Sequence, residues 1–161
     1  MSMLYQKAVN NQLQYHAEQI SMIEPLRNLK EQWSDVKCLF TKKKTKSGGW
    51  VMKTGVPTGT IGVYRIIYKP TMETMSIGVG IVAQRLSTHR SIFINKGKIK
   101  VHKDTQTKSP TASHMYNYNR HRGNWLFNWC EIPNRALAGA FEEVLILTEQ
   151  PKFNNLSMAG K

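Results

Sequence analysis

Acidic residues, and aspartates above all, are scarce in this chain of 161 residues. Only Asp35 and Asp104 are aspartates, and ten acidic residues stand against 23 lysines and arginines, which gives a formal net charge of +13. So few aspartates argue against an Asp-rich calcium site and against a two-metal nuclease centre built from several carboxylates. The sequence thus disfavours the metal sites that depend most on carboxylate ligands.

Cysteines and long apolar segments are also rare. Neither Cys38 nor Cys130 has a CxxC partner, and two cysteines by themselves cannot supply a four-ligand zinc cluster. We expect both to be free thiols in a reducing compartment. No run approaches the roughly 18 apolar residues of a membrane span, and the N-terminal segment lacks the pattern of a signal peptide. These absences predict a cytoplasmic protein with no membrane partner.

The positive charge is concentrated in the middle of the chain. Of the 23 basic residues, 17 lie between Lys37 and Arg122, where only two residues are acidic. Such a region attracts a polyanion, because neutralising its phosphates releases condensed counterions. We therefore expect a nucleic-acid partner, and the alternatives are a basic surface kept for solubility and an acidic membrane surface.

Residue patterns predict three strands. Residues 59–69 and 75–81 are rich in β-branched and aromatic side chains and are separated by a turn containing proline, which predicts a β-hairpin. Residues 124–132 have the same character and predict a third strand. We expect these strands to form one small antiparallel sheet.

Helical spacing appears between and after these strands. Residues 82–93 and 111–122 are expected to form two helices, and 133–150 form the clearest one, with Asn134 as N-cap and Pro151 as its stop. Helices packed on a small three-stranded antiparallel sheet make an α+β fold.

The N-terminal third has a different composition. Residues 3–34 have helical character, and 41–49 combine a basic run with Ser-Gly-Gly and predict a loop. We therefore expect two parts, an N-terminal helical arm with a basic loop (1–58) and a folded domain (59–161).

Four side chains in the second part could perform phosphodiester chemistry. Such a nuclease needs a base or an activated water, a cation facing the phosphate and a metal carboxylate. The hairpin offers Tyr64, the following helix offers Arg85 and His89 one turn apart, and the last helix offers Glu142. Taken singly, each has an ordinary explanation, because strand tyrosines mostly pack and charged helix residues mostly face solvent.

Together these residues belong to motifs that resemble the GIY-YIG nuclease family over roughly residues 59–155. The motifs occur in the family's order: Gly62-Val63-Tyr64, Ser76-Ile77-Gly78, Arg85 with His89 four residues later, Glu142-x-x-Leu145-Ile146, and Pro151-x-Phe153-Asn154.

The resemblance implies a role for each residue. Tyr64 would help to deprotonate the attacking water, Arg85 would stabilise charge on the scissile phosphate, and His89 would assist proton transfer or hold Tyr64 and the phosphate. Glu142, rather than its neighbour, would bind one Mg²⁺ or Mn²⁺ ion per active site, and Asn154 would brace the site. The implied activity is that of a metal-dependent DNA endonuclease of the compact restriction or phage type.

Two features depart from the family pattern. Ser76 stands where the family commonly has tyrosine, and the spacing from Gly78 to Arg85 is one residue shorter than usual. Either the hairpin end is shortened or another residue, such as Tyr68 or a lysine, replaces the missing phenol. A degenerate scaffold that binds DNA or RNA without cutting is therefore the alternative function, and a structural assembly protein is a third.

Recognition of double-stranded DNA would fall to segments around the nuclease module. Most of their lysines would contact phosphate, and a few other residues would read bases. A double-strand break also requires a homodimer or a second binding event, because one site cuts one strand. The expected DNA-binding residues are Lys42, Lys43, Lys44, Lys46, Lys96, Lys98, Lys100, Lys103, Arg120 and Arg122.

Overall fold

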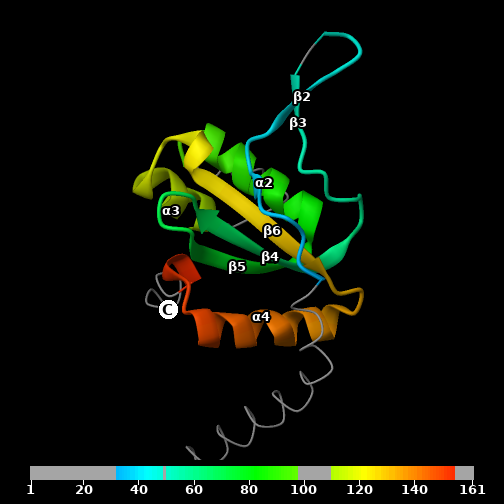
Figure 1. Cartoon of the computed structure of the whole chain (residues 1–161), viewed down its shortest axis with the longest axis vertical. Helices are drawn as coiled ribbons and strands as arrows, with labels where there is room; N and C mark the ends of the chain where they lie inside the picture. Colours follow the sequence, from blue (N-terminus) through cyan, green and yellow to red (C-terminus); the bar gives the residue numbers. More distant parts are fainter. Residues whose placement is uncertain (1–31, 49, 98–109, 155–161) are drawn as a thin grey trace, which may run out of the picture.

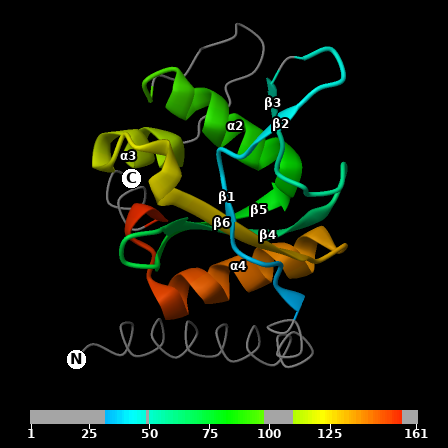
Figure 2. The ribbon, with the colours of Figure 1, turned by 45° about the horizontal axis from the view of Figure 1, so that its top comes forward.

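The computed structural model describes residues 32–48, 50–97 and 110–154, which form an α+β fold (Figure 1). A four-stranded antiparallel sheet has the strand order β1-β6-β4-β5. Helices α2 and α3 cover one face of this sheet, and α4 covers the other (Figure 2). The elements are β1 (Lys37–Cys38), β4 (Ile61–Tyr68), β5 (Glu73–Ile81), α2 (Val82–Ile94), α3 (Pro110–Tyr118), the short 3₁₀ helix η2 (Arg122–Asn124), β6 (Trp125–Glu131) and α4 (Arg135–Glu149).

The sheet contains one strand more than the three predicted. The additional strand is β1, whose Lys37 and Cys38 pair with Phe127 and Leu126 of β6. Two residues are too few to show an alternating pattern, so this strand forms through its pairing with β6 rather than through a local signal. The α+β class and the other three strands are confirmed.

Strands β4 and β5 form the predicted hairpin, and β4 lies between β5 and β6. Alternation along β4 places Tyr64 toward α2 and α3, and Val63 toward α4. At Gly62 a Cβ atom would stand 3.0 Å from the carbonyl carbon of Cys130 and would overlap its oxygen. Glycine therefore permits the close approach of β4 and β6 at this point.

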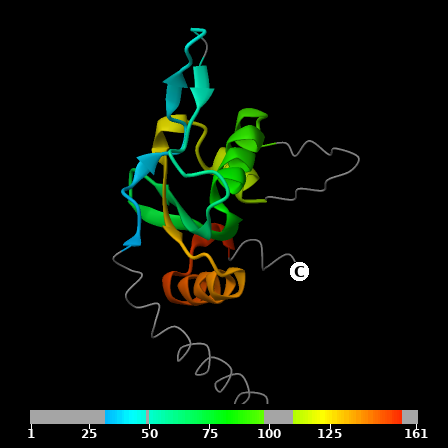
Figure 3. The ribbon, with the colours of Figure 1, turned by 90° about the vertical axis from the view of Figure 1, so that its right-hand side faces the viewer.

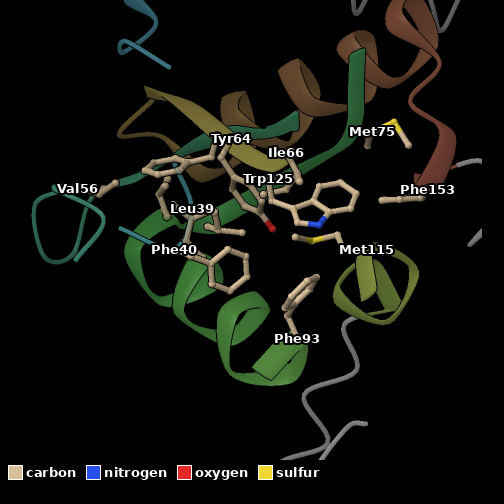
Figure 4. Close-up of a cluster of buried hydrophobic side chains, with 13 residues drawn as sticks. Leu39, Phe40, Val56, Tyr64, Ile66, Met75, Phe93, Met115, Trp125 and Phe153 are labelled. Carbon is tan, nitrogen blue, oxygen red and sulfur yellow. The ribbon is translucent and has the colours of Figure 1, made fainter. Parts of the chain in front are cut away.

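Two apolar clusters hold the helices on the sheet. The larger cluster lies under α2 and α3 and contains the fully buried Trp125 and Phe127. Figure 4 shows Trp125 between Ile66 and Met115 in this cluster. Leu39, Phe40 and Val56, which precede β4, belong to this same cluster. The smaller cluster lies under α4 and contains Val63, Ile77, Cys130, Ile132, Ala138, Phe141 and Leu145.

Helix α4 has the ends expected from its sequence. The side chain of Asn134 accepts a hydrogen bond from the backbone N–H of Leu137 at 3.1 Å. Gln150 closes the helix in a left-handed conformation with φ of 47°, immediately before Pro151. Helix α3 is shorter than its predicted range of 111–122. It ends at Tyr118, and the short helix η2 follows.

The predicted basic loop at 41–49 is in fact mostly a β-hairpin. Strand β2 (Lys42–Lys44) pairs with β3 (Trp50–Met52) as a separate two-stranded sheet. A run of three lysines has little intrinsic preference for a strand, so pairing across the turn decides its conformation. The predicted N-terminal arm lies largely in residues 1–31, outside the described residues.

Neither Cys38 nor Cys130 takes part in a disulfide bond within the described residues. Among the described residues, no helix combines the length and apolar character that crossing a membrane requires.

Candidate active site

An open pocket lies where β5 ends and α2 begins, at the edge strand of the sheet. It has a volume of about 380 Å³ and is lined by Val79, Gly80, Ile81, Gln84, Arg85 and Arg135. Arg85 reaches it from the first turn of α2, and Arg135 reaches it from the first residue of α4. The pocket is therefore lined by two arginines, from helices on opposite faces of the sheet.

The predicted residues Tyr64, Arg85, His89 and Glu142 act on one another electrostatically. Tyr64 Oη lies 2.8 Å from His89 Nε2. Burial is the main cause of the pKa shifts of Tyr64, His89 and Glu142, and the Arg85 charge lowers all three pKa values. The Glu142 carboxylate in turn raises the pKa of Tyr64. The fold thus brings together groups from β4, α2 and α4.

Tyr64 and His89 form a buried pair that is neutral at neutral pH. Tyr64 is 1% exposed and His89 is 2% exposed. Burial raises the pKa of Tyr64 to about 12, although the charge of Arg85 and a hydrogen bond from it act in the opposite direction. Burial and the Arg85 charge lower the pKa of His89 to about 3. A neutral imidazole that carries its proton on Nδ1 can accept a hydrogen bond from the phenol at Nε2.

We expect His89 to make the protein sensitive to acid. Its pKa is about 3 in the folded protein and 6.5 for the free side chain, so the unfolded chain binds a proton that the folded chain excludes. The free energy of unfolding is then fully retained above pH 6.5 and falls as the pH drops toward 3. Between about pH 6.5 and 4.5 the loss from this group is about 2–3 kcal/mol.

Urea denaturation of wild type and His89→Gln at several pH values tests this expectation. The His89→Gln protein should show a shallower decline of the unfolding free energy with falling pH. The opposite contribution of Glu142, whose raised pKa favours the folded state at low pH, is present in both proteins and cancels in the comparison. Parallel curves for the two proteins would contradict the assignment.

Glycines on β5 leave room for the catalytic candidates. Gly78 pairs with Tyr64 across the hairpin, and a Cβ atom at Gly78 would lie 2.5 Å from Tyr64 Cζ. Gly80 lies two residues further along the same face, and a Cβ there would be 3.5 Å from Cγ of Arg85. At the end of β5, therefore, no side chain stands between the strand backbone and Tyr64 or Arg85.

We expect Gly78→Ala to displace the Tyr64 ring. The added methyl cannot share its space with the ring, so the protein should lose about 1–3 kcal/mol of unfolding free energy. The hydrogen bond between Tyr64 and His89 should also be disturbed, which NMR of the His89 ring would detect. Gly139→Ala is the control, because a Cβ at this α4 position meets nothing within 4 Å. Equal effects of the two substitutions would contradict this role of Gly78.

Glu142 lies half-buried on α4, whereas Glu143 is exposed. Burial raises the pKa of Glu142 to about 7, the Arg85 charge lowers it and the Glu143 charge raises it. A carboxyl with this pKa is ionised in roughly half of the molecules at neutral pH. A divalent cation would bind the ionised form and favour it.

Glu142 is the metal ligand expected from the sequence. The described part of the chain contains no group of three or more His, Cys, Asp and Glu residues that could hold a metal ion. A cation held by Glu142 alone would need waters and substrate oxygens to complete its shell. Mg²⁺ commonly binds in this way, through one or two carboxylates together with waters and substrate phosphates.

Asn154 braces the strand that carries Gly78. Its side-chain oxygen accepts a hydrogen bond from the backbone N–H of Ile77 at 2.9 Å, and its amide nitrogen donates to the Ile77 carbonyl at 3.0 Å. The side chain thus pairs with edge strand β5 much as a neighbouring strand would. Asn154 therefore holds the backbone of β5 at Ile77, next to Gly78.

The surroundings of Ser76 and Tyr68 bear on one of the alternatives for the missing phenol. Ser76 is buried, and its hydroxyl lies 3.2 Å from the hydroxyl of Thr111 on α3. Tyr68 lies at the far end of β4, where its hydroxyl accepts a hydrogen bond from Asn119 at 3.1 Å. Tyr68 therefore does not supply a second phenol beside Tyr64.

The expected DNA-binding residues are distributed over several surfaces. Lys42, Lys43 and Lys44 are exposed on β2, and Lys46 is exposed in the following turn. Lys96 follows α2, and Arg120 stacks over the Tyr116 ring at 5.0 Å. None of these residues lines the pocket. Exposed Arg122 lies in η2, while Lys98, Lys100 and Lys103 are outside the described residues.

Arg135 and Gln84 line the pocket, although neither was expected from the sequence. Gln84 immediately precedes Arg85, and Arg135 immediately follows the helix cap Asn134. Their position in the sequence could have identified both residues, because each lies in the first turn of a helix. Free backbone N–H groups there favour anions.

Comparisons with protein-family models, curated proteins and solved structures found no match for this chain.

Proposed function

We propose that the protein is a divalent-metal-dependent DNA endonuclease with a catalytic module like that of the GIY-YIG family. The observation that supports this most is the electrostatic coupling of Tyr64, Arg85, His89 and Glu142, with Arg85 lining an open pocket. The group comprises a phenol, a guanidinium, an imidazole and a carboxylate. These are the chemical types that hydrolysis of a phosphodiester requires.

Arg85 is the group that would bind the scissile phosphate. Its Nε atom is buried and has no hydrogen-bond partner among the described residues. Because an unsatisfied buried donor is costly, a phosphate oxygen at this position would gain a strong, charge-assisted hydrogen bond. Arg135 borders the same pocket and would contact a neighbouring phosphate.

Tyr64 and His89 would pass the proton of the attacking water. With a pKa of about 12 the phenol is a poor base, but it can accept this proton while donating its own to His89 Nε2. The water oxygen bonds to phosphorus, the bond to the leaving oxygen breaks, and that oxygen takes up a proton from solvent. His89 then returns its proton through Tyr64 to solvent, which restores the neutral pair. The negative phosphate beside Arg85 offsets the effect of Arg85 on the pKa of His89.

A Mg²⁺ or Mn²⁺ ion held by Glu142 would supply positive charge against the phosphate and the leaving oxygen. The excess of basic residues in the middle of the chain supports a polyanionic substrate, and double-stranded DNA is the substrate we propose. Cleavage of both strands would require a homodimer on DNA or a second binding event.

The burial of Tyr64 favours a second candidate, a basic DNA- or RNA-binding protein on a degenerate nuclease scaffold. A phenol that is 1% exposed gives an attacking water little access in the absence of substrate. The two candidates agree on binding and differ only in cleavage.

Incubation of supercoiled plasmid with the pure protein tests the proposal. Nicked or linear products should form with Mg²⁺ or Mn²⁺ and should disappear in EDTA. Sequencing of the product ends would then give the site preference and the stagger of the cuts. Binding of the plasmid without any cleavage in either metal would instead support the second candidate.

A further inference from the structure

The β2–β3 hairpin projects from the body of the protein, on the side of the sheet away from α4 (Figure 3). Its strands pair from Lys42 opposite Met52 to Lys44 opposite Trp50. The ladder continues at the base, where Lys53 N–H donates to the Thr41 carbonyl at 3.0 Å. The segment is therefore an ordered two-stranded ribbon rather than an irregular loop.

The turn of this ribbon is polar and closed. Gly48 N–H donates to the Thr45 carbonyl at 3.0 Å, and the Thr45 and Ser47 hydroxyls lie 3.0 Å apart. Gly48 has a φ of 86°, a conformation that glycine adopts readily. The tip thus carries two hydroxyls in contact with each other, together with the exposed side chain of Lys46.

The ribbon carries charge of one sign only. The sequence has no acidic residue between Asp35 and Glu73. Five lysines are exposed on the ribbon and at its base, which makes it a concentrated cationic surface suited to a polyanion. They are Lys42, Lys43, Lys44, Lys46 and Lys53.

The dimensions of the ribbon match the major groove of B-DNA. Two paired strands lie about 4.8 Å apart, so a ribbon with its side chains fits a groove about 12 Å wide but not one about 6 Å wide. From Thr41 to Thr45 the strand extends about 13 Å, which exceeds the groove depth of about 8.5 Å. The tip is therefore long enough to reach base edges.

The ribbon is also connected to the candidate active site. After β3 the chain runs to Thr60, whose carbonyl accepts a hydrogen bond from Val82 N–H at 3.0 Å. Val82 is the first residue of α2, three residues before Arg85. A duplex held by the ribbon would thus be anchored close to the helix that bears the phosphate-binding arginine.

We propose that the β2–β3 hairpin enters the major groove of duplex DNA. The strand lysines contact phosphates on the groove walls, while Thr45, Lys46 and Ser47 at the tip face the base edges. This inference rests on the proposed function, and it identifies the element that selects the cleavage site.

Footprinting with dimethyl sulfate in EDTA tests groove entry, on duplexes that the full chain selects from a random-sequence pool. This reagent methylates guanine N7 in the major groove and adenine N3 in the minor groove. The wild-type protein should protect guanine N7 and leave adenine N3 reactive. The variant Lys42→Ala/Lys44→Ala should lose this protection, whereas Lys69→Ala/Lys152→Ala should keep it, because these two exposed lysines lie outside the ribbon.

Affinity measured over a range of salt concentrations provides a second readout. Each phosphate contact contributes about 0.9 to the slope of log affinity against log salt, so the Lys42→Ala/Lys44→Ala variant should lose about 2 from the slope. At about 0.1 M salt its affinity should be lower than that of wild type by a factor on the order of 50. The control variant should retain both the slope and the affinity of wild type.

Reactive guanine N7 under the wild-type protein, or protection that survives in the Lys42→Ala/Lys44→Ala variant, would overturn groove entry. If the wild type still cleaves plasmid in that case, only this inference fails. If the wild type neither binds nor cleaves duplex DNA, the proposed function and the inference fail together.

Discussion

Replacing Glu142 by glutamine is expected to lower the rate of DNA cleavage by about three orders of magnitude. The substitution keeps the size of the side chain but removes the negative charge that would hold the divalent cation. Loss of a bound metal removes several kcal/mol of transition-state stabilisation, and each 1.4 kcal/mol corresponds to about a factor of ten in rate. Single-turnover cleavage and Mn²⁺ binding measured by calorimetry should both be lost.

The Glu142→Gln protein should remain folded. Burial disfavours the ionised Glu142 carboxylate, so in the absence of metal the variant should be at least as stable as wild type at pH 8. Glu143→Gln is the matched control, because it removes the same charge from the next, exposed position. It should retain both cleavage and Mn²⁺ binding. Equal losses in the two variants, or none in either, would contradict the assignment of Glu142.

Replacing Arg85 by alanine is expected to lower the rate of cleavage by about two to three orders of magnitude. A preorganised donor that faces charge developing in the transition state typically contributes this much. We expect this of Arg85 because its Nε lacks a partner among the described residues and Arg85 lines the pocket. Single-turnover kinetics with saturating DNA would isolate the effect on the chemical step.

Two further variants make this result specific. Arg85→Lys keeps the charge but lacks the planar fork, so it should restore only a small part of the rate. Lys69→Ala removes an equal charge from an exposed position that lies outside the pocket and outside the expected DNA-binding residues, and it should leave the rate of the chemical step unchanged. Full activity of Arg85→Ala at saturating DNA would remove Arg85 from the catalytic machinery.

Much of the sheet and of its flanking helices could be predicted because the signals are local. Alternating β-branched and aromatic residues mark β4, β5 and β6, and an apolar stripe between Asn134 and Pro151 marks α4. Strand β1 and the β2–β3 hairpin could not be predicted in this way. Their two- and three-residue strands form through partners that local patterns do not reveal.

The candidate site also combines a feature that the local sequence predicts with features that depend on the tertiary structure. Arg85 and His89 lie one helical turn apart, so the sequence by itself determined that these two side chains point the same way. Only the tertiary structure decided that Tyr64 and Glu142 join them and that Arg135 faces the pocket from another helix. That meeting depends on edge strand β5, where Gly78 leaves space for the phenol and Asn154 braces the backbone. Contacts between residues so far apart in the chain arise from packing on the sheet, and no local pattern encodes them.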